Sequence, residues 1–223
     1  MVESGLVAFD MDDTLLNGRV VFEAAEHWGF KESVLKIMNL NIEKYRQSEA
    51  IATLFKGLDK EEALKIVKKI PLMPGCEETI RKLKASGYKI GIISDSYTFV
   101  TEYLKTRLAL DFDEANVLEE QAGIFTGQLH MPLGWQNNNC TCQRSVCKRA
   151  SLRKQAAKLG LIRGRTFAVG DNLGDICMLE EASVSIAFNP KYQDVSNAAC
   201  YTVHGDLRKI LQHIPISDSQ TEI

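Results

Sequence analysis

The chain has 223 residues, of which 45% are hydrophobic, which is enough for one sizeable core or for a core with a smaller appended unit. Its 27 lysines and arginines nearly balance its 29 aspartates and glutamates, so no basic excess is available to neutralise nucleic-acid phosphates. No apolar run approaches the roughly 18 residues of a membrane span, and no secretory signal is visible at the start. We therefore expect a cytoplasmic protein with no nucleic-acid or membrane partner; the oligomeric state is unknown.

The first strand is predicted at residues 6–9, an unbroken apolar run that is typical of a strand buried on both faces. It ends in Asp10 and Asp12, which are two residues apart and leave an extended chain on the same side. Ligands of open α/β sheets bind at the carboxyl ends of strands. Two carboxylates held together repel each other unless a cation or a shared proton offsets their charge. The alternative interpretation is a capped loop after a core strand.

Residues 20–70 show helical periodicity, with apolar residues three and four positions apart. Asp59 is the predicted N-cap of the last helix, with Glu62 placed as in a capping box. Two prolines, Pro71 and Pro74, close the segment. We interpret residues 17–74 as a small inserted helical cap that acts as a lid or in specificity; the alternative is that it pads the edge of the core.

The remainder of the chain alternates between strand and helix patterns. Strands are predicted at residues 88–93, 166–169, 184–188 and 201–203, and helices at 75–86, 99–108, 150–159 and 207–214. This alternation predicts an α/β fold with a doubly wound parallel sheet. Residues 116–147 interrupt it with short strand patterns and a cysteine-rich stretch. We assign residues 1–16 and 75–215 to the α/β core, with a hairpin and cysteine-rich insertion at about 117–147.

Polar side chains follow several of the predicted strands. Folding into one sheet would bring together four carboxylates, one hydroxyl and one ammonium, from Asp10, Asp12, Ser94, Lys148, Asp171 and Asp175. So many carboxylates need a counter-charge. A hard divalent cation with oxygen ligands, Mg²⁺ above all, would balance them together with Lys148 and leave room for a dianion.

This combination suits phosphoryl transfer, in which catalysis consists of positioning and charge neutralisation. A carboxylate can serve as the nucleophile and pass through an aspartyl-phosphate. The second acid, Asp12, could be held protonated by its neighbours, donate to the leaving oxygen, and then take a proton from the hydrolytic water.

Four stretches resemble, in order and spacing, the four motifs of the haloacid dehalogenase-like phosphatases: Asp10-Met11-Asp12-Asp13-Thr14-Leu15, Ile93-Ser94-Asp95, Lys148 and Gly170-Asp171-Asn172-Leu173-Gly174-Asp175. The resemblance implies a Rossmann-like core and a phosphoric monoester hydrolase, with Asp10 as nucleophile and Asp12 as general acid and base. It also implies a Mg²⁺ site at Asp10, the backbone carbonyl of Asp12, and Asp171. Ser94 and Lys148 would hold phosphoryl oxygens, and Asp175 would complete the metal site by orienting Lys148 or a metal-bound water.

Two branches of that family share features with the chain. The position of the helical unit and the Pro71-x-x-Pro74-Gly75 pattern resemble the phosphoserine phosphatases. However, the glutamate that receives the substrate ammonium in those enzymes falls at Arg19, and the arginine that binds the serine carboxylate falls at Ile51. The pair of glycines after the second-motif serine is replaced by Asp95-Ser96.

Two stretches are similar to the phosphoethanolamine and phosphocholine phosphatases: the segment from Ile93 to Phe99, and the cluster of Cys140, Cys142 and Cys147 that leads into Lys148. In that group an aspartate at the position of Asp95 is expected to meet a substrate amine. A second acid of that group falls at Val21, where Glu23 or Glu26 could substitute. A carboxylate beside the phosphate site favours a cationic leaving group, although Asp95 could instead cap the following helix.

We therefore expect a Mg²⁺-dependent phosphomonoesterase acting on a small phosphorylated metabolite, with an amino-alcohol phosphate as the first expectation. Phosphoserine phosphatase and a phosphotransferase that passes the phosphoryl group to an alcohol are the alternatives within enzymes. A catalytically inactive module that binds a phosphorylated metabolite is the alternative from another class.

Three cysteines form a cluster that can be interpreted as a zinc site, a disulfide or reduced thiols: Cys140, Cys142 and Cys147. The usual C-x2–4-C pairs of zinc sites are absent, and His130 is only a candidate for the fourth ligand. A disulfide is atypical of a reducing compartment outside hyperthermophiles. The other cysteines, Cys76, Cys177 and Cys200, are interpreted as small core residues.

Overall fold

The computed structural model describes residues 4–138, 140–161 and 165–216. Within these ranges no helix has both the length and the apolar character required to cross a bilayer. The strands are β1 (Gly5–Phe9), β2 (Tyr88–Tyr97), β3 (Phe112–Gln121), β4 (Ile124–His130), β5 (Thr166–Gly170), β6 (Val184–Phe188) and β7 (Tyr201–Val203).

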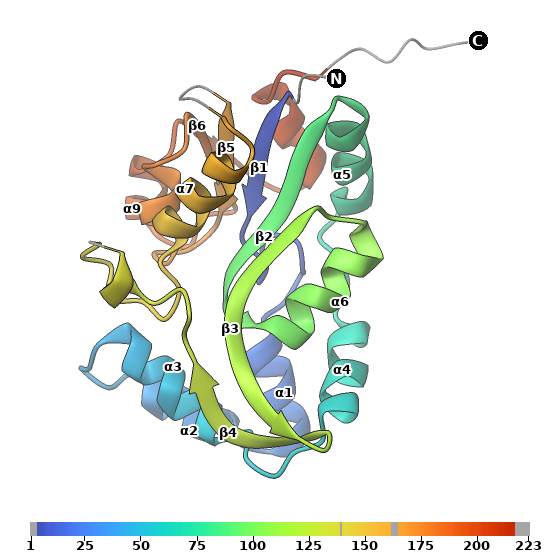
Figure 1. Cartoon of the computed structure of the whole chain (residues 1–223). Helices are drawn as coiled ribbons and strands as arrows, with labels where there is room; N and C mark the ends of the chain where they lie inside the picture. Colours follow the sequence, from blue (N-terminus) through green and yellow to red (C-terminus); the bar gives the residue numbers. More distant parts are fainter. Residues whose placement is uncertain (1–3, 139, 162–164, 217–223) are drawn as a thin grey trace.

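The strands form one sheet in the order β4-β3-β2-β1-β5-β6-β7 (Figure 1). Neighbouring strands are parallel except β3 and β4, which pair antiparallel. This arrangement confirms the predicted doubly wound α/β fold. The chain proceeds from β1 outward to β2 and β3 on one side, and later to β5 and β6 on the other. The carboxyl end of β1 is therefore the switch point at which such sheets bind ligands.

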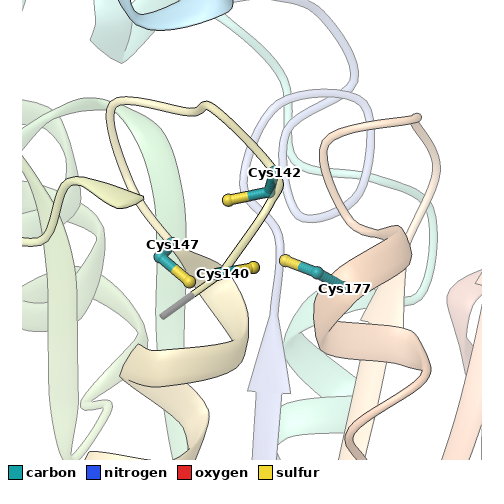
Figure 2. A group of neighbouring side chains, drawn as sticks. All are labelled: Cys140, Cys142, Cys147 and Cys177. Carbon is teal, nitrogen blue, oxygen red and sulfur yellow. The ribbon is translucent and has the colours of Figure 1, made fainter. Parts of the chain in front are cut away.

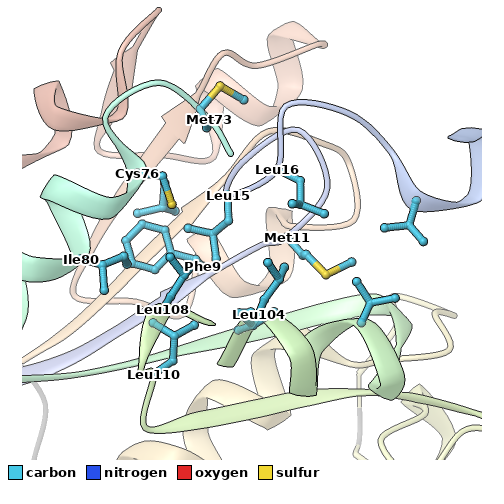
Figure 3. Close-up of a cluster of buried hydrophobic side chains, with 14 of the residues drawn as sticks. Phe9, Met11, Leu15, Leu16, Met73, Cys76, Ile80, Leu104, Leu108 and Leu110 are labelled. Atoms are coloured by element: carbon cyan, nitrogen blue, oxygen red, sulfur yellow. The ribbon is translucent and has the colours of Figure 1, made fainter. Parts of the chain in front are cut away.

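Helices cover both faces of the sheet, and β1 contributes side chains to each face in alternation. Val7 and Phe9 pack in a cluster with α5 (Cys76–Ala85), α6 (Thr98–Leu108) and the 3₁₀ helix η2 (Leu207–Gln212), part of which is drawn in Figure 3. Leu6 and Ala8 pack on the other face, against α7 (Lys148–Lys158), α8 (Ile176–Leu179) and α9 (Gln193–Asn197). Burial on both faces explains why β1 has no polar positions.

The segment with helical periodicity forms α1 (Val20–Trp28), α2 (Lys31–Met38), α3 (Lys44–Thr53) and α4 (Lys60–Lys69), beyond the carboxyl end of β1 (Figure 1). Asp59 caps α4 as predicted, because its side chain accepts from the Glu62 amide at 2.8 Å. The Glu62 carboxylate instead lies 2.9 Å from His27 Nε2. The division into a core and a cap of residues 17–74 stays a prediction.

Three predicted elements differ from those observed. Strand β2 continues to Tyr97, past the predicted end at residue 93, because an irregularity after Ile93 lets it pair again with β3 at Asn116. The short strand patterns at residues 123–127 and 128–130, within the interruption at 116–147, form one strand, β4. The last helix is a 3₁₀ helix. A second short 3₁₀ helix, η1 (Trp135–Asn137), follows β4.

Phe55 is fully buried where the four helices meet the sheet. Its ring lies edge-on to Trp28 and Phe30, with centroids 6.3 and 5.5 Å away, and to Tyr97 and Phe125 of β2 and β4, at 5.3 and 6.1 Å. Edge-to-face pairs of this kind add to the free energy of burial. The core cluster that contains this ring includes residues of α1, α3 and α4, so it joins these helices to the sheet in one continuous core.

Replacing Phe55 by alanine should lower the free energy of unfolding by about 3–5 kcal/mol, since it removes a fully buried ring and leaves a cavity. Leu40→Ala is the matched control, because Leu40 is 50% exposed and its loss should change stability by less than about 0.5 kcal/mol. Urea unfolding of both variants measures the difference. Equal losses of unfolding free energy in the two variants would contradict the central role of the Phe55 ring.

Candidate active site

The loop after β1 turns sharply and holds two acids at the end of the strand. The Met11 carbonyl accepts from the amides of Leu15 and Leu16, both at 2.9 Å, and Asp13 has a left-handed φ of 60°. The Asp10 amide donates to the carbonyl of Val169 in β5 at 2.9 Å. Asp10 is consequently fixed by the sheet itself rather than by a free loop.

Lys148 is the first residue of α7 and joins Asp10 to Asp175. Its Nζ lies 2.5 Å from Asp10 Oδ1 and 2.6 Å from Asp175 Oδ1, and the three side chains are at least 91% buried. The second oxygen of Asp175 accepts from the amides of Asp171 and Asn172 at 3.0 and 2.9 Å. Both oxygens of Asp175 are thus engaged, and they fix the position of the ammonium.

Burial and mutual electrostatic interactions shift the pKa values of Asp10 and Lys148. Burial raises the pKa of Asp10 well above its usual range, and the Asp175 carboxylate adds to this, while Lys148 opposes it. Burial alone would lower the pKa of Lys148, but attraction to Asp10 and Asp175 outweighs it and the pKa is raised. Lys148 therefore stays charged, and the excess negative charge falls on the carboxylates.

A third buried acid, Asp171, completes the group. One carboxylate oxygen from each of Asp10, Asp171 and Asp175 lies within 4.8 Å of the other two. Oxygens on opposite sides of one Mg²⁺ ion are about 4.2 Å apart, given bonds of about 2.1 Å. The oxygen donors of Asp10 and Asp171, with a pKa of Asp171 that burial raises, fit a divalent cation in both charge and ligand type, and Asp175 lies beside them with both oxygens engaged.

Asp12 lies on the same turn but points elsewhere. Its side chain is half-buried, and Oδ1 accepts from the Val20 amide at 2.8 Å at the start of α1. Burial raises the pKa of Asp12 to about 7, although the Val20 amide acts in the opposite direction. A carboxyl group with this pKa exchanges a proton near neutral pH.

The acids, the lysine and Asp95 line one cavity of about 390 Å³. Ser94 reaches the same edge but is buried, accepts from the Ser96 amide at 3.1 Å, and is not among the described residues that line the cavity. Asp95 is exposed at the cavity. It does not cap α6, whose N-cap is Tyr97 without a side-chain hydrogen bond.

Sequence reasoning missed several basic residues of the site. Lys191 Nζ lies 2.8 Å from Asp171 Oδ2 and also pairs with Asp13. Lys191 follows β6 at a strand end, the position used to find the other site residues, so the same criterion could have found it. Arg144 and Lys44 also line the cavity; they lie in a loop and at the start of α3, where the sequence carries no comparable signal.

The comparisons with known proteins agree with this geometry. The family model of the haloacid dehalogenase-like hydrolases matches residues 7–180. A phosphoserine phosphatase of Methanocaldococcus jannaschii is 33% identical over 215 residues, which cover 94% of this chain and 97% of that protein. One of Streptomyces coelicolor is 33% identical over 190 residues, covering 83% and 44%.

A solved phosphoserine phosphatase, described as a phospho-aspartyl intermediate analogue, superposes with a TM-score of 0.81 at 31% identity, covering 96% of this chain and 100% of that one. The chain spans only about half the length of some curated relatives, 44% of the Streptomyces coelicolor protein and 54% of one from Archaeoglobus fulgidus.

Asp12→Asn should raise the free energy of unfolding at neutral pH when divalent cations are removed. The folded-state pKa of about 7 exceeds the ordinary value of 3.8, so the folded protein binds this proton more tightly than the unfolded chain. The contribution of Asp12 to stability is thus fully present below about pH 3.8 and is lost as the pH rises through about 7.

Urea unfolding across this pH range measures the effect. The gain in unfolding free energy of Asp12→Asn over the wild type should be absent at the acidic end, grow with pH, and level off above about pH 7. Glu49→Gln, at an exposed position of α3, is the control and should show no such trend. Equal stability of Asp12→Asn and wild type at pH 8 would contradict the raised pKa.

Proposed function

The chain belongs to the haloacid dehalogenase-like hydrolases, and from this premise we propose that it is a Mg²⁺-dependent phosphatase that hydrolyses O-phosphoserine to serine and phosphate. The relatives bear out the predicted enzyme class, a phosphoric monoester hydrolase. The observation that carries the proposal is the buried Lys148, held between Asp10 and Asp175 where the cavity meets the end of β1.

The choice of phosphoserine departs from our first expectation of an amino-alcohol phosphate. The relatives named above are phosphoserine phosphatases, which favours the alternative. The cavity wall offers charges for both ends of an amino acid: Asp95 for the ammonium, and Arg19, Lys44 and Arg144 for the carboxylate. Phosphoethanolamine has no carboxylate and would leave these cations without a substrate anion to bind.

Arg144 is the favoured carboxylate partner among them. A Cβ atom added at Gly174 would lie 3.4 Å from Arg144 Nη1 and 3.8 Å from Asp95 Oδ2, so both charged groups flank the same glycine beside the acidic group. Ile51, which stands at the position of the usual carboxylate-binding arginine, also lines the cavity but is apolar. Arg144 thus supplies from the cysteine-rich loop a positive charge that position 51 lacks.

In the proposed reaction the Asp10 carboxylate attacks phosphorus and the bond from phosphorus to the serine oxygen breaks. Asp12, protonated near neutral pH, donates its proton to that oxygen. Water then gives a proton to Asp12 and attacks the aspartyl-phosphate, which releases phosphate and restores Asp10. Lys148 holds a phosphoryl oxygen, and Asp175 orients Lys148. Ser94 is buried next to Asp95 of the cavity wall, and we propose that it donates its own proton to a second phosphoryl oxygen that reaches past the wall, since its oxygen only accepts from the Ser96 amide.

Mg²⁺ bound by Asp10, Asp171 and the Asp12 backbone carbonyl would neutralise charge on the phosphoryl oxygens. In this proposal Asp175 acts through Lys148, because both of its oxygens are already engaged.

Asp10→Asn should lower the turnover of phosphoserine and of p-nitrophenyl phosphate by at least about three orders of magnitude, because an amide is not a nucleophile. Wild-type turnover should be lost in EDTA and restored by Mg²⁺. The control Glu49→Gln should keep wild-type rates. Turnover by Asp10→Asn with an unchanged rate would exclude the proposed nucleophile.

A substrate panel separates the proposed substrate from the first expectation. The ratio kcat/KM should be higher for phosphoserine than for phosphoethanolamine or phosphocholine. Arg144→Gln should lower it about 10- to 100-fold for phosphoserine, the equivalent of one lost charged hydrogen bond, and leave it unchanged for phosphoethanolamine. A preference of the wild-type protein for phosphoethanolamine would overturn the assignment of phosphoserine.

A further inference from the structure

Four cysteine side chains converge outside the acidic group (Figure 2). Their sulfur atoms, from Cys140, Cys142, Cys147 and Cys177, all lie within 4.8 Å of one another and are directed into one common space. All four are free thiols; three are buried and Cys142 is half-buried. The prediction that Cys177 is only a small core residue is therefore incomplete, and the prediction for Cys200 is wrong because Cys200 is exposed, whereas Cys76 is buried as expected.

We propose that these four cysteines bind one structural Zn²⁺ ion. Zinc in structural sites is tetrahedral with four thiolate or imidazole ligands, and with bonds of about 2.3 Å the sulfur atoms are about 3.8 Å apart. Four sulfurs within 4.8 Å approach this spacing from three separate places in the chain. Cys177 of α8, rather than His130, supplies the ligand that the sequence left unidentified.

The sulfur spacing separates this site from two alternatives. In an iron–sulfur cluster, sulfide ions lie between the irons and hold the protein thiolates farther apart than one ion does. A disulfide brings two sulfurs to about 2.05 Å and leaves the others out, whereas here each sulfur faces the other three. Soft thiolates select zinc over Mg²⁺, which prefers oxygen.

Two backbone amides and two arginine side chains lie beside the four sulfur atoms. The backbone amides of Arg144 and Ala150 donate to the sulfurs of Cys142 and Cys147. A zinc ion with four thiolates carries a net charge of −2, and two arginines lie close enough to offset it. The Arg149 guanidinium interacts electrostatically with the Cys177 sulfur and donates to the Cys177 carbonyl at 3.1 Å. The Arg153 guanidinium interacts electrostatically with the sulfurs of Cys147 and Cys140.

The proposed ion would set the position of the catalytic lysine. Cys147 directly precedes Lys148, and Cys177 follows Asp175 by two residues, so one ion would connect the two chain segments that hold this ion pair. The cysteine loop also contacts α3, because the Tyr45 amide donates to the Gln143 carbonyl at 3.1 Å. The zinc site would consequently also hold the cavity wall that carries Arg144.

Metal analysis of the full-length protein tests the site without reference to its activity. Protein purified under reducing conditions, without chelators or metal-affinity steps, should contain about one zinc ion per chain when it is measured by elemental mass spectrometry. Cobalt uptake by the zinc-depleted, reduced protein should reach one ion per chain, with the intense visible bands of tetrahedral cobalt thiolate. Failure of the reduced protein to bind either metal at this ratio, or a disulfide among the four cysteines in freshly purified protein, would overturn the proposal.

Variants locate the ligands. Cys142→Ser and Cys177→Ser should lose the zinc and lower the thermal midpoint, whereas Cys200→Ser, at an exposed position, should keep both at wild-type values. Cys142 is half-buried, so its serine variant is the one least expected to disturb folding. Zinc retained by Cys142→Ser and Cys177→Ser would overturn the assignment of the ligands.

Phosphate binding tests the effect on Lys148. The affinity for inorganic phosphate, measured by calorimetry in Mg²⁺, should fall several-fold in Cys142→Ser and remain unchanged in Cys200→Ser. An unchanged affinity in the zinc-free variant would show that the ion does not position Lys148.

Discussion

The structure depends on one buried ammonium ion between two carboxylates. Lys148 is 2% exposed and contacts Asp10 and Asp175 at hydrogen-bond distance. Removing such charges from water costs several kcal/mol for each ion, which their attraction offsets only when the remaining polar atoms are also satisfied. Two backbone amides satisfy the second oxygen of Asp175, which shows how closely the loop after β5 is fitted to this pair. An ion group of this kind adds little to stability, so its presence points to function.

The same α/β core can serve many phosphate esters, and the cavity wall must select among them. Helices α1–α3 and the cysteine-rich loop provide that wall. Two positions that read the amino acid in phosphoserine phosphatases carry Arg19 and Ile51 here, so the usual charges are exchanged or lost. In the proposed assignment Arg144 supplies a positive charge from the cysteine-rich loop. Under that assignment the chain would keep the balance of charge that an amino acid requires while changing the element that supplies it.

The strands, the helices and the acids at strand ends were predictable because their signals are local: apolar runs, helical spacing and polar residues directly after a strand. The contact of Lys148 with Asp10 joins residues 138 positions apart; the strand-end argument placed both in one group, but nothing in the sequence gave the direct pairing. The extension of β2 to Tyr97 depends on pairing with β3, which the sequence of β2 alone does not reveal. Cys177 escaped notice for the same reason, since α8 lies against α7 only in the folded structure and not along the sequence.

Helices α7 and α8 connect the two groups of ligands. On one side of them carboxylate oxygens face the cavity, and on the other side sulfur atoms face one another. Hard and soft ligands select different metals, so a Mg²⁺ ion and a Zn²⁺ ion could occupy neighbouring positions without exchanging. Lys148 lies next to Cys147 in sequence, and Asp175 lies two residues before Cys177. A rigid thiolate site at that place would fix the separation of two helix starts, and through them the ion pair on which the acidic group depends.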